Sequence, residues 1–254
     1  MLVRIVGGNG GLAPGFRNTS YLIDGKLLID AGSVASGLSL EEQLLVENII
    51  ISHPHLDHIS DLAFLPDNCF GLKGVPFEVY TSKTVRNAIK KHLMNDLIWP
   101  DFSKLPSEEN PTIRFHDLKP EQMIVLGDYK VFPVRVNHFG DAVGLIIERD
   151  DAAILFTQDT GPTERIWEVA KSYKNLKAIF SEVSFPNKMQ NVADASLHLT
   201  PQSVFKEIAK MPPTIPIFLG HIKPNYKSTI YQEIDELGCE RITLFCSDDT
   251  HFVF

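Results

Sequence analysis

The sequence predicts a mixed α/β protein in which two packed β-sheets are covered on their outer faces by helices, an α/β/β/α sandwich. Three observations support this fold class. Short apolar runs of strand length, bounded by turn residues, recur along the 254-residue chain. Amphipathic segments with helical spacing separate several of these runs. A content of 44% hydrophobic and 22% charged residues is typical of a globular protein with a full core.

The N-terminal fifth of the chain predicts four strands, at 2–6, 19–24, 26–30 and 47–52. Leu27-Leu28-Ile29 and Ile49-Ile50-Ile51 are short apolar runs of the kind found in buried strands. Asp24-Gly25 is a strong signal for a two-residue turn. The second and third strands are therefore expected to form a hairpin.

Helices and strands alternate through the rest of the chain. A helix is expected at 83–95, after Ser82 as N-cap, with an apolar face formed by Val85, Ala88, Ile89 and Leu93. Strands are expected near 112–115, 129–136, 143–149, 153–157, 177–181, 215–219 and 242–246. A second helix should begin at Thr200-Pro201 and bury Val204, Phe205 and Ile208. Because no linker divides the chain, one domain over 1–254 is expected.

Charge and cysteine content exclude several classes of protein. The net charge is -8, and no run of Lys and Arg is longer than Lys90-Lys91, which argues against a nucleic-acid-binding surface. Three unclustered cysteines, Cys69, Cys239 and Cys246, indicate neither a disulfide framework nor a cysteine zinc site, so a cytoplasmic location is expected. Neither a signal peptide nor a membrane span is indicated.

A short segment after the fourth strand, His53-Pro54-His55-Leu56-Asp57-His58, contains four potential metal ligands. In an extended stretch His53 and His55 point the same way, whereas a following turn lets Asp57 and His58 face a second point. The segment therefore predicts two metal ions, each needing further ligands. The alternative is a solvated polar loop.

Three further candidate ligands, His138, Asp159 and His221, each lie just beyond an apolar strand. Taken singly, each is more readily explained as a structural histidine or a turn aspartate. Together with the first segment they favour a site for two divalent ions, with Asp159 placed to bridge them. The many imidazoles favour zinc, with manganese or iron as alternatives. His92 is expected to be solvated on its helix, and His116 and His251 have no supporting pattern.

This ligand series resembles that of the metallo-β-lactamase superfamily over nearly the whole chain. Asn18 to Ile23 and Leu28 to Ser33 resemble the opening strands of that fold. The resemblance implies the four-layer sandwich of the metallo-β-lactamase type. It also implies one ion held by His53, His55 and His138, a second held by Asp57, His58 and His221, and Asp159 as the bridge.

Two segments indicate a branch of the superfamily. Ser52 to Ile59 is similar to the signature of class II cyclic-nucleotide phosphodiesterases, and Lys91 to Phe102 resembles another segment typical of that family. Asp61 stands where the signature has glycine, which leaves the shape of this loop and the substrate preference open. The resemblance implies a cyclic nucleotide as substrate, with cyclic AMP favoured, and 66–110 is expected to be an insertion on the substrate side.

A third resemblance concerns proton transfer. The segments that contain Glu182 and His198 look like motifs of phosphodiester-cleaving members, in which the histidine protonates the leaving alkoxide and the glutamate orients it. The expected reaction is hydrolysis of a 3′,5′-cyclic nucleotide to a 5′-monophosphate by a metal-bridging hydroxide. Asp57, Glu182 and His198 are the expected catalytic residues. A structural role for His198, with its ring bonded to the backbone, is the alternative.

Base recognition is the least specific expectation. Aromatic rings and amides near the expected site are candidates for stacking on or bonding to the base, although simple packing is the commoner role: Asn68, Phe70, Asn95, Trp99 and Phe185. An RNA-processing nuclease, a thioester or lactone hydrolase, and a non-enzymatic metal- or nucleotide-binding module are the alternatives. A small-molecule partner is expected, with no nucleic acid and no membrane, and a homodimer is left open.

Overall fold

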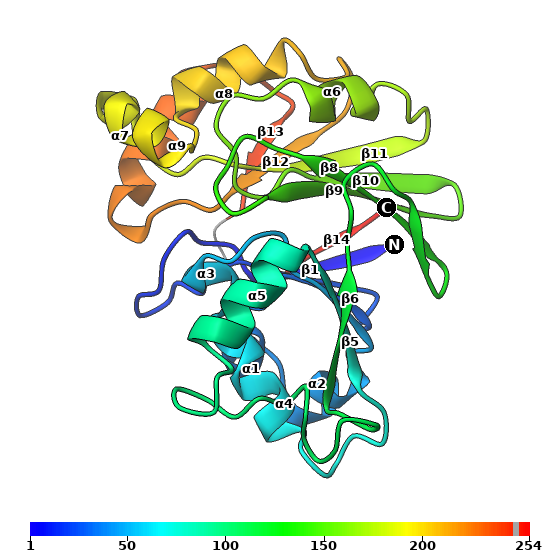
Figure 1. Cartoon of the computed structure of the whole chain (residues 1–254). Helices are drawn as coiled ribbons and strands as arrows, with labels where there is room; N and C mark the ends of the chain where they lie inside the picture. The colour runs from blue at the N-terminus through cyan, green and yellow to red at the C-terminus, as the bar shows by residue number, and fades with distance from the viewer. Residues whose placement is uncertain (246–248) are drawn as a thin grey trace.

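Two seven-stranded sheets pack face to face in the computed structural model, which describes residues 1–245 and 249–254 (Figure 1). The first sheet contains, in spatial order, β14 (Thr250–Val253), β1 (Leu2–Gly7), β2 (Ser20–Ile23), β3 (Leu27–Ile29), β4 (Asn48–Ile50), β5 (Phe77–Thr81) and β6 (Ile113–Asp117). The second contains β13 (Ile242–Leu244), β12 (Ile217–Gly220), β11 (Leu176–Glu182), β10 (Ala152–Phe156), β9 (Val143–Arg149), β8 (Tyr129–Arg135) and β7 (Ile124–Leu126).

Helices cover both outer faces, so the predicted α/β/β/α sandwich is confirmed (Figure 1). The lower group in Figure 1 includes α1 (Val34–Gly37), α2 (Leu40–Leu45), α3 (Leu56–Ile59), α4 (Phe64–Asn68) and α5 (Lys83–His92). The upper group includes α6 (Arg165–Ala170), α7 (Gln190–Ser196), α8 (Pro201–Ile208) and α9 (Lys227–Asp235). Within the described residues, no helix combines the length and the apolar character needed to cross a bilayer.

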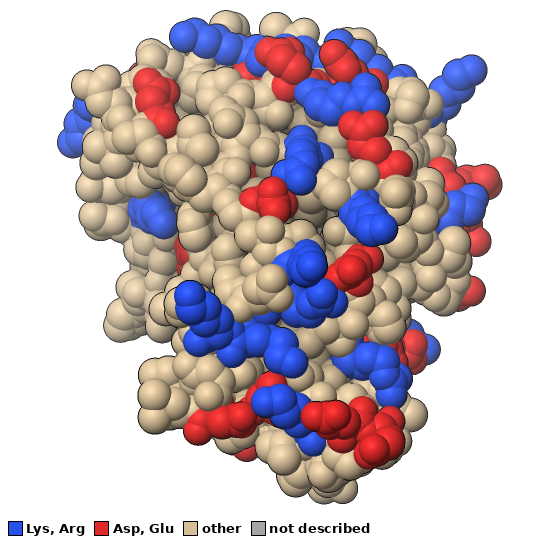
Figure 2. Space-filling model, in the orientation of Figure 1, with Lys and Arg blue, Asp and Glu red and all other residues tan. Residues whose placement is uncertain are grey.

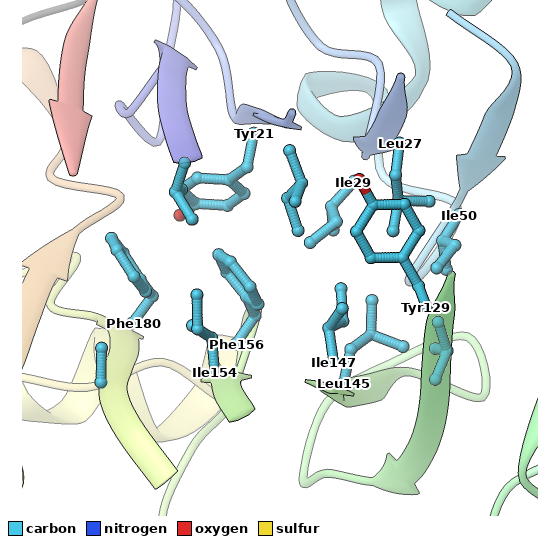
Figure 3. Packing of buried hydrophobic residues seen from close by; sticks show 14 of the residues in the cluster. Tyr21, Leu27, Ile29, Ile50, Tyr129, Leu145, Ile147, Ile154, Phe156 and Phe180 are labelled. Atoms are coloured by element: carbon cyan, nitrogen blue, oxygen red, sulfur yellow. The ribbon is translucent and has the colours of Figure 1, made fainter. Parts of the chain in front are cut away.

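Alternation along the strands divides the apolar side chains between three layers. Tyr21 and Ile23 of β2 belong to the core between the sheets, whereas Leu22 packs under the helices of the first sheet. Figure 3 shows Tyr21 facing Phe156 and Phe180 of the second sheet across this central core. The ring centroids of Tyr21 and Phe156 are 5.2 Å apart, and those of Phe156 and Phe180 are 4.9 Å apart.

Local signals placed the predicted hairpin and helix starts correctly. β2 and β3 pair antiparallel, so the hairpin is confirmed, but three residues, Asp24 to Lys26, connect the paired Ile23 and Leu27 where a two-residue turn was expected. Asp24 and Gly25 both have positive φ. Ser82 accepts a hydrogen bond from the backbone N–H of Val85 at the start of α5, and Thr200 caps α8 in the same manner. His92 is exposed, as expected.

Other expectations were incomplete or wrong. Phe205 was expected to be buried by α8 but is 54% exposed, because it is turned about 100° around the helix from the buried Val204. β5, β7 and β14 have no predicted counterpart; β7 and β14 are short edge strands with weak patterns. Within 66–110, β5 and α5 are part of the sandwich, and the expected role of this segment as an insertion on the substrate side stays a prediction. The last residue of the strand predicted at 242–246 lies outside the described residues.

Candidate metal centre

Parallel pairing brings distant ligands to one edge of the sandwich. β10, β11 and β12 are parallel neighbours, so their carboxyl ends meet and place Asp159, Glu182 and His221 close together. In the first sheet β3 is parallel to β4, the loop after β4 carries His53 and His55, and the following helix α3 carries Asp57 and His58. Both sheets therefore contribute side chains to the same cluster.

The seven expected ligand residues come together in two groups. His53, His55 and His138 form one group with Asp159, and Asp57, His58 and His221 form the other; within each group the potential ligand atoms lie within 4.8 Å of one another. The Oδ2 atom of Asp159 lies between the groups. It is 3.5 Å from Nε2 of His53, 3.3 Å from Nε2 of His58 and 3.2 Å from Nε2 of His221.

The other ring nitrogen of four histidines is held by the protein. Nδ1 of His58 lies 2.6 Å from Asp30, and Nδ1 of His221 lies 2.8 Å from the hydroxyl of Thr19. Nδ1 of His53 lies 3.0 Å from the hydroxyl of Ser52, while Nδ1 of His138 donates to a backbone carbonyl at 2.9 Å. These contacts fix the ring orientations, as outer contacts of metal-ligating histidines do.

The residues fit a pair of divalent ions. Nε2 of His53, His58 and His221 is buried and makes no hydrogen bond within the described residues. Leaving a buried polar atom unpaired costs free energy, and three such atoms converge here on one shared carboxylate. Imidazole nitrogens and carboxylate oxygens are the donor set that zinc and related divalent ions take.

Burial and charge shift the pKa values of the clustered side chains in both directions. Burial lowers the pKa of His58, but the charges of Asp159 and Asp30 outweigh it and raise that pKa well above its usual value, so a metal ion would have to displace this proton. Burial lowers the pKa of His53 well below its usual value, which keeps the imidazole neutral. Burial alone would raise the pKa of the Asp159 carboxyl, but the charges of His221 and His58 outweigh it and hold that pKa well below its usual range. Asp159 is therefore ionised.

Asp30 and Gln158 form a second layer of contacts that the sequence did not single out. Asp30 accepts hydrogen bonds from the backbone N–H of Ser52 at 2.8 Å, from the Ser52 hydroxyl at 2.8 Å, and from the side-chain amide of Gln158. It thus holds His58 directly and His53 through Ser52. Gln158 adopts a positive φ of 53°, which costs free energy in a residue other than glycine.

Gln158→Gly is expected to weaken metal binding by up to about 10-fold, the lower end of the effect of losing a ligand's own outer contact, because Gln158 supports Asp30 and not a ligand directly. Glycine accepts the positive φ without strain, and Asp30 keeps its bonds from Ser52 and His58, so the fold should persist. Calorimetric titration of metal-free protein with Zn²⁺ measures the change. Asp150→Gly, at an exposed turn with φ 52°, is the matched control. Equal zinc affinity in Gln158→Gly and wild-type protein would show that Asp30 needs no support from Gln158.

The predicted Glu182–His198 pair lies beside the cluster. Nδ1 of His198 is 2.7 Å from Oε1 of Glu182, and both side chains are buried. Glu182 also accepts hydrogen bonds from the backbone N–H of Thr160 at 2.9 Å and from the hydroxyl of Ser184 at 2.7 Å. The His198 ring centroid lies 4.9 Å from that of His138. Burial lowers the pKa of His198, but the charge and hydrogen bond of Glu182 outweigh it and raise that pKa overall.

Five side chains were predicted to contact the substrate. Of these, Phe185 lies beside the Glu182–His198 pair, with its ring centroid 5.8 Å from that of His198. The ring of Phe70 packs against that of Phe102, with the two ring centroids 5.9 Å apart. The indole N–H of Trp99 donates to the carbonyl of Ala63 at 2.9 Å.

The two predicted amide contacts also have local partners. The Asn68 amide donates to Gln43 at 3.0 Å, and the side-chain oxygen of Asn95 accepts from the backbone N–H groups of Leu97 and Ile98. Among the described residues, Asn68, Phe70, Asn95 and Trp99 make no recorded contact with the metal-ligand groups or with His198.

Asp61, the departure from the expected signature, makes a local contact. Its carboxylate accepts hydrogen bonds from the backbone N–H groups of Ala35 at 2.8 Å and Ser36 at 3.2 Å, in the first turn of α1. The side chain thus ties the segment after α3 to α1, where a glycine would leave these N–H groups without this partner.

Comparisons with known proteins agree with this architecture. A family model described as "Beta-lactamase superfamily domain" matches residues 27–222. A "Probable 3′,5′-cyclic-nucleotide phosphodiesterase" of Yersinia pestis is 26% identical over 312 residues, covering 97% of this chain and 88% of that protein. A "3′,5′-cyclic-nucleotide phosphodiesterase" of Aliivibrio fischeri is 28% identical over 251 residues, covering 80% and 73%. The structure of unliganded yeast PDE1 matches with a TM-score of 0.78 at 18% identity, covering 98% of each chain, which shows a shared fold.

Proposed function

Because the chain belongs to the metallo-β-lactamase superfamily, we propose that it hydrolyses 3′,5′-cyclic nucleotides to 5′-monophosphates with two divalent metal ions. The carrying observation is the buried His198–Glu182 pair beside the two groups of ligand side chains. The names of the two curated relatives support the substrate class. We propose zinc as the metal, with manganese or iron as alternatives, and cyclic AMP as the favoured substrate.

The seven ligand residues of the two groups would hold the ions. Bound there, two divalent ions would supply a hydroxide nucleophile and stabilise the charge that builds up on the phosphate during in-line displacement. Two ions bring about +4 against about -2 from Asp57 and Asp159. A protein with a net charge of -8 can therefore attract a singly charged phosphodiester at this point.

His198 would protonate the departing 3′-oxygen as its bond to phosphorus breaks. Glu182 engages Nδ1 of this ring, so Nε2 is the nitrogen left to carry the transferred proton. Thr160 and Ser184 hold the carboxylate of Glu182 and so fix the direction of the imidazole. A sugar alkoxide leaves poorly without a proton, and a positioned acid accelerates such a step by about a hundredfold or more.

The charge distribution favours a small substrate over a polynucleotide. On the face shown in Figure 2, Lys and Arg are interspersed with Asp and Glu over much of the surface. A nuclease that grips a polyanion would need phosphate contacts over a broad basic surface. A thioester or lactone hydrolase would have no need for a buried histidine acid of this kind. The cysteine content supports a cytoplasmic location for the proposed enzyme.

A hydrolysis panel with elemental analysis tests the proposal. The substrates are 3′,5′-cyclic AMP, 3′,5′-cyclic GMP, 2′,3′-cyclic AMP and bis(p-nitrophenyl) phosphate. We expect the highest kcat/KM for 3′,5′-cyclic AMP, 5′-AMP as the product, and two equivalents of metal per chain. Efficient turnover of the aryl diester with no turnover of either 3′,5′-cyclic nucleotide would sink the proposed substrate class.

A further inference from the structure

An exposed aromatic ring stands beside the first ligand group. Phe139 follows His138 in the loop between β8 and β9 and is 50% exposed. Its ring centroid lies 5.6 Å from that of His138 and 6.3 Å from that of His55. The ring is thus at the rim of the cluster, with half of its surface in contact with solvent.

The loop that carries Phe139 is anchored on both sides of this ring. Asp141 accepts hydrogen bonds from Arg135 at 2.8 Å and from the hydroxyl of Thr84 at 2.5 Å. On the other side, the carbonyl of Asn137 accepts from the backbone N–H of Gly161 at 2.8 Å, and the Asn137 amide donates to a backbone carbonyl at 3.0 Å. These bonds limit the freedom of the loop to turn Phe139 inwards.

Close packing of Gly140 adds to this constraint. Gly140 has a φ of 73°, and a Cβ at this position would lie 2.4 Å from Cδ of Pro54. The chain therefore needs glycine directly after Phe139 to bring this loop against the segment that carries His53 and His55. The backbone that carries Phe139 is therefore anchored on both sides of the ring.

The segment His53–His58 also carries an exposed apolar side chain. Leu56 lies between His55 and Asp57 and is 66% exposed. By contrast, Phe185 is half-buried, and its ring packs near His198 and Tyr226. Phe139 is therefore the more accessible of the two rings that the structure records beside the site.

We propose that the Phe139 ring is the stacking platform for the nucleobase. The inference rests on the proposed function and extends it to base recognition. A half-exposed aromatic ring on an anchored backbone suits a planar base, because every base offers a flat face for stacking. Phe139 thus favours nucleoside cyclic phosphates over base-free ribose cyclic phosphate and does not separate adenine from guanine.

Phe139→Ala is expected to lower kcat/KM for 3′,5′-cyclic AMP and 3′,5′-cyclic GMP by the same factor. The factor should lie between about 5-fold and 150-fold, since stacking on one aromatic ring is worth about 1 to 3 kcal/mol. Most of the loss should appear in KM. Hydrolysis of ribose 3′,5′-cyclic phosphate should be unchanged, and Phe139→Trp should retain activity on both nucleotides.

Phe205→Ala is the matched control, because Phe205 is similarly exposed, at 54%, but lies on α8. Thermal unfolding verifies that each variant is folded. Equal losses of kcat/KM on ribose 3′,5′-cyclic phosphate and on the two nucleotides would overturn the inference. Such a result would mean that Phe139 supports the positions of the ligand side chains and does not contact the base. Unchanged kcat/KM for the nucleotides would overturn it as well.

Calorimetric binding of 5′-AMP separates this inference from the proposed function. If wild-type protein hydrolyses neither 3′,5′-cyclic AMP, nor 3′,5′-cyclic GMP, nor ribose 3′,5′-cyclic phosphate, the proposed function is wrong. In that case weaker binding of 5′-AMP by Phe139→Ala than by wild-type protein still supports stacking, and equal binding overturns it.

Discussion

Asp159→Ala is expected to reduce turnover of 3′,5′-cyclic AMP by at least about a thousandfold, the equivalent of about 4 kcal/mol in the activation barrier. The Asp159 carboxylate lies between both ligand groups, with Oδ2 3.5 Å from Nε2 of His53 and 3.2 Å from Nε2 of His221. Its removal leaves two sets of imidazoles without the shared negative charge. Metal content, measured by elemental analysis, should fall in parallel.

The fold should survive this substitution, because three separate apolar layers hold the sheets and helices together. Circular dichroism and thermal unfolding of the metal-free proteins check this point. Asp151→Ala, in the exposed turn before β10, is the matched control and should behave as wild type. Wild-type activity in a folded, metal-depleted Asp159→Ala protein would falsify the two-metal model.

His198→Ala should slow hydrolysis of 3′,5′-cyclic AMP by about a hundredfold or more, because the 3′-alkoxide would leave without a positioned proton donor. The rate of hydrolysis of bis(p-nitrophenyl) phosphate should fall much less in this variant, since nitrophenolate leaves readily without a proton. Comparing kcat for the two substrates in the same variant measures this difference. Glu182→Gln should show the same selectivity in weaker form, because the amide still engages the ring but carries no charge.

His92→Ala is the control for His198→Ala, because His92 is exposed at the end of α5. Metal content in His198→Ala should match that of wild-type protein. Equal losses on the cyclic nucleotide and on the aryl diester, without loss of metal, would mean that His198 does not act as the acid. A small loss on both substrates would favour a thioester or lactone hydrolase.

The ligand groups could be anticipated because their signal is local. His53 to His58 is one short segment, and His138, Asp159 and His221 each follow an apolar strand, so reading strand ends was enough to find them. The structure shows that these residues meet, and their roles as ligands remain proposals. Asp30 carries the same signal, since it directly follows β3, and could have been found in this way.

The contacts around the ligands could not be read from the sequence. Asp30 and Gln158 are separated by 128 positions, and their hydrogen bond exists because the carboxyl ends of β3 and β10 meet across the sandwich. The prominence of Phe139 depends on the anchored loop between β8 and β9. The apolar pattern that suggested burial of Phe205 did not specify which side of α8 faces the sheet.

The two ligand groups contain residues from both sheets, and this arrangement links metal supply to the stability of the protein in a cell. His53 to His58 extend from the first sheet, whereas His138, Asp159 and His221 extend from the second. Ions bound there would hold the two sheets together, and for each bound ion a tenfold rise in free metal above the dissociation constant would add about 1.4 kcal/mol of stability. When metal is scarce, the protein would therefore lose its activity and, because it is less stable, would also be degraded faster by proteases.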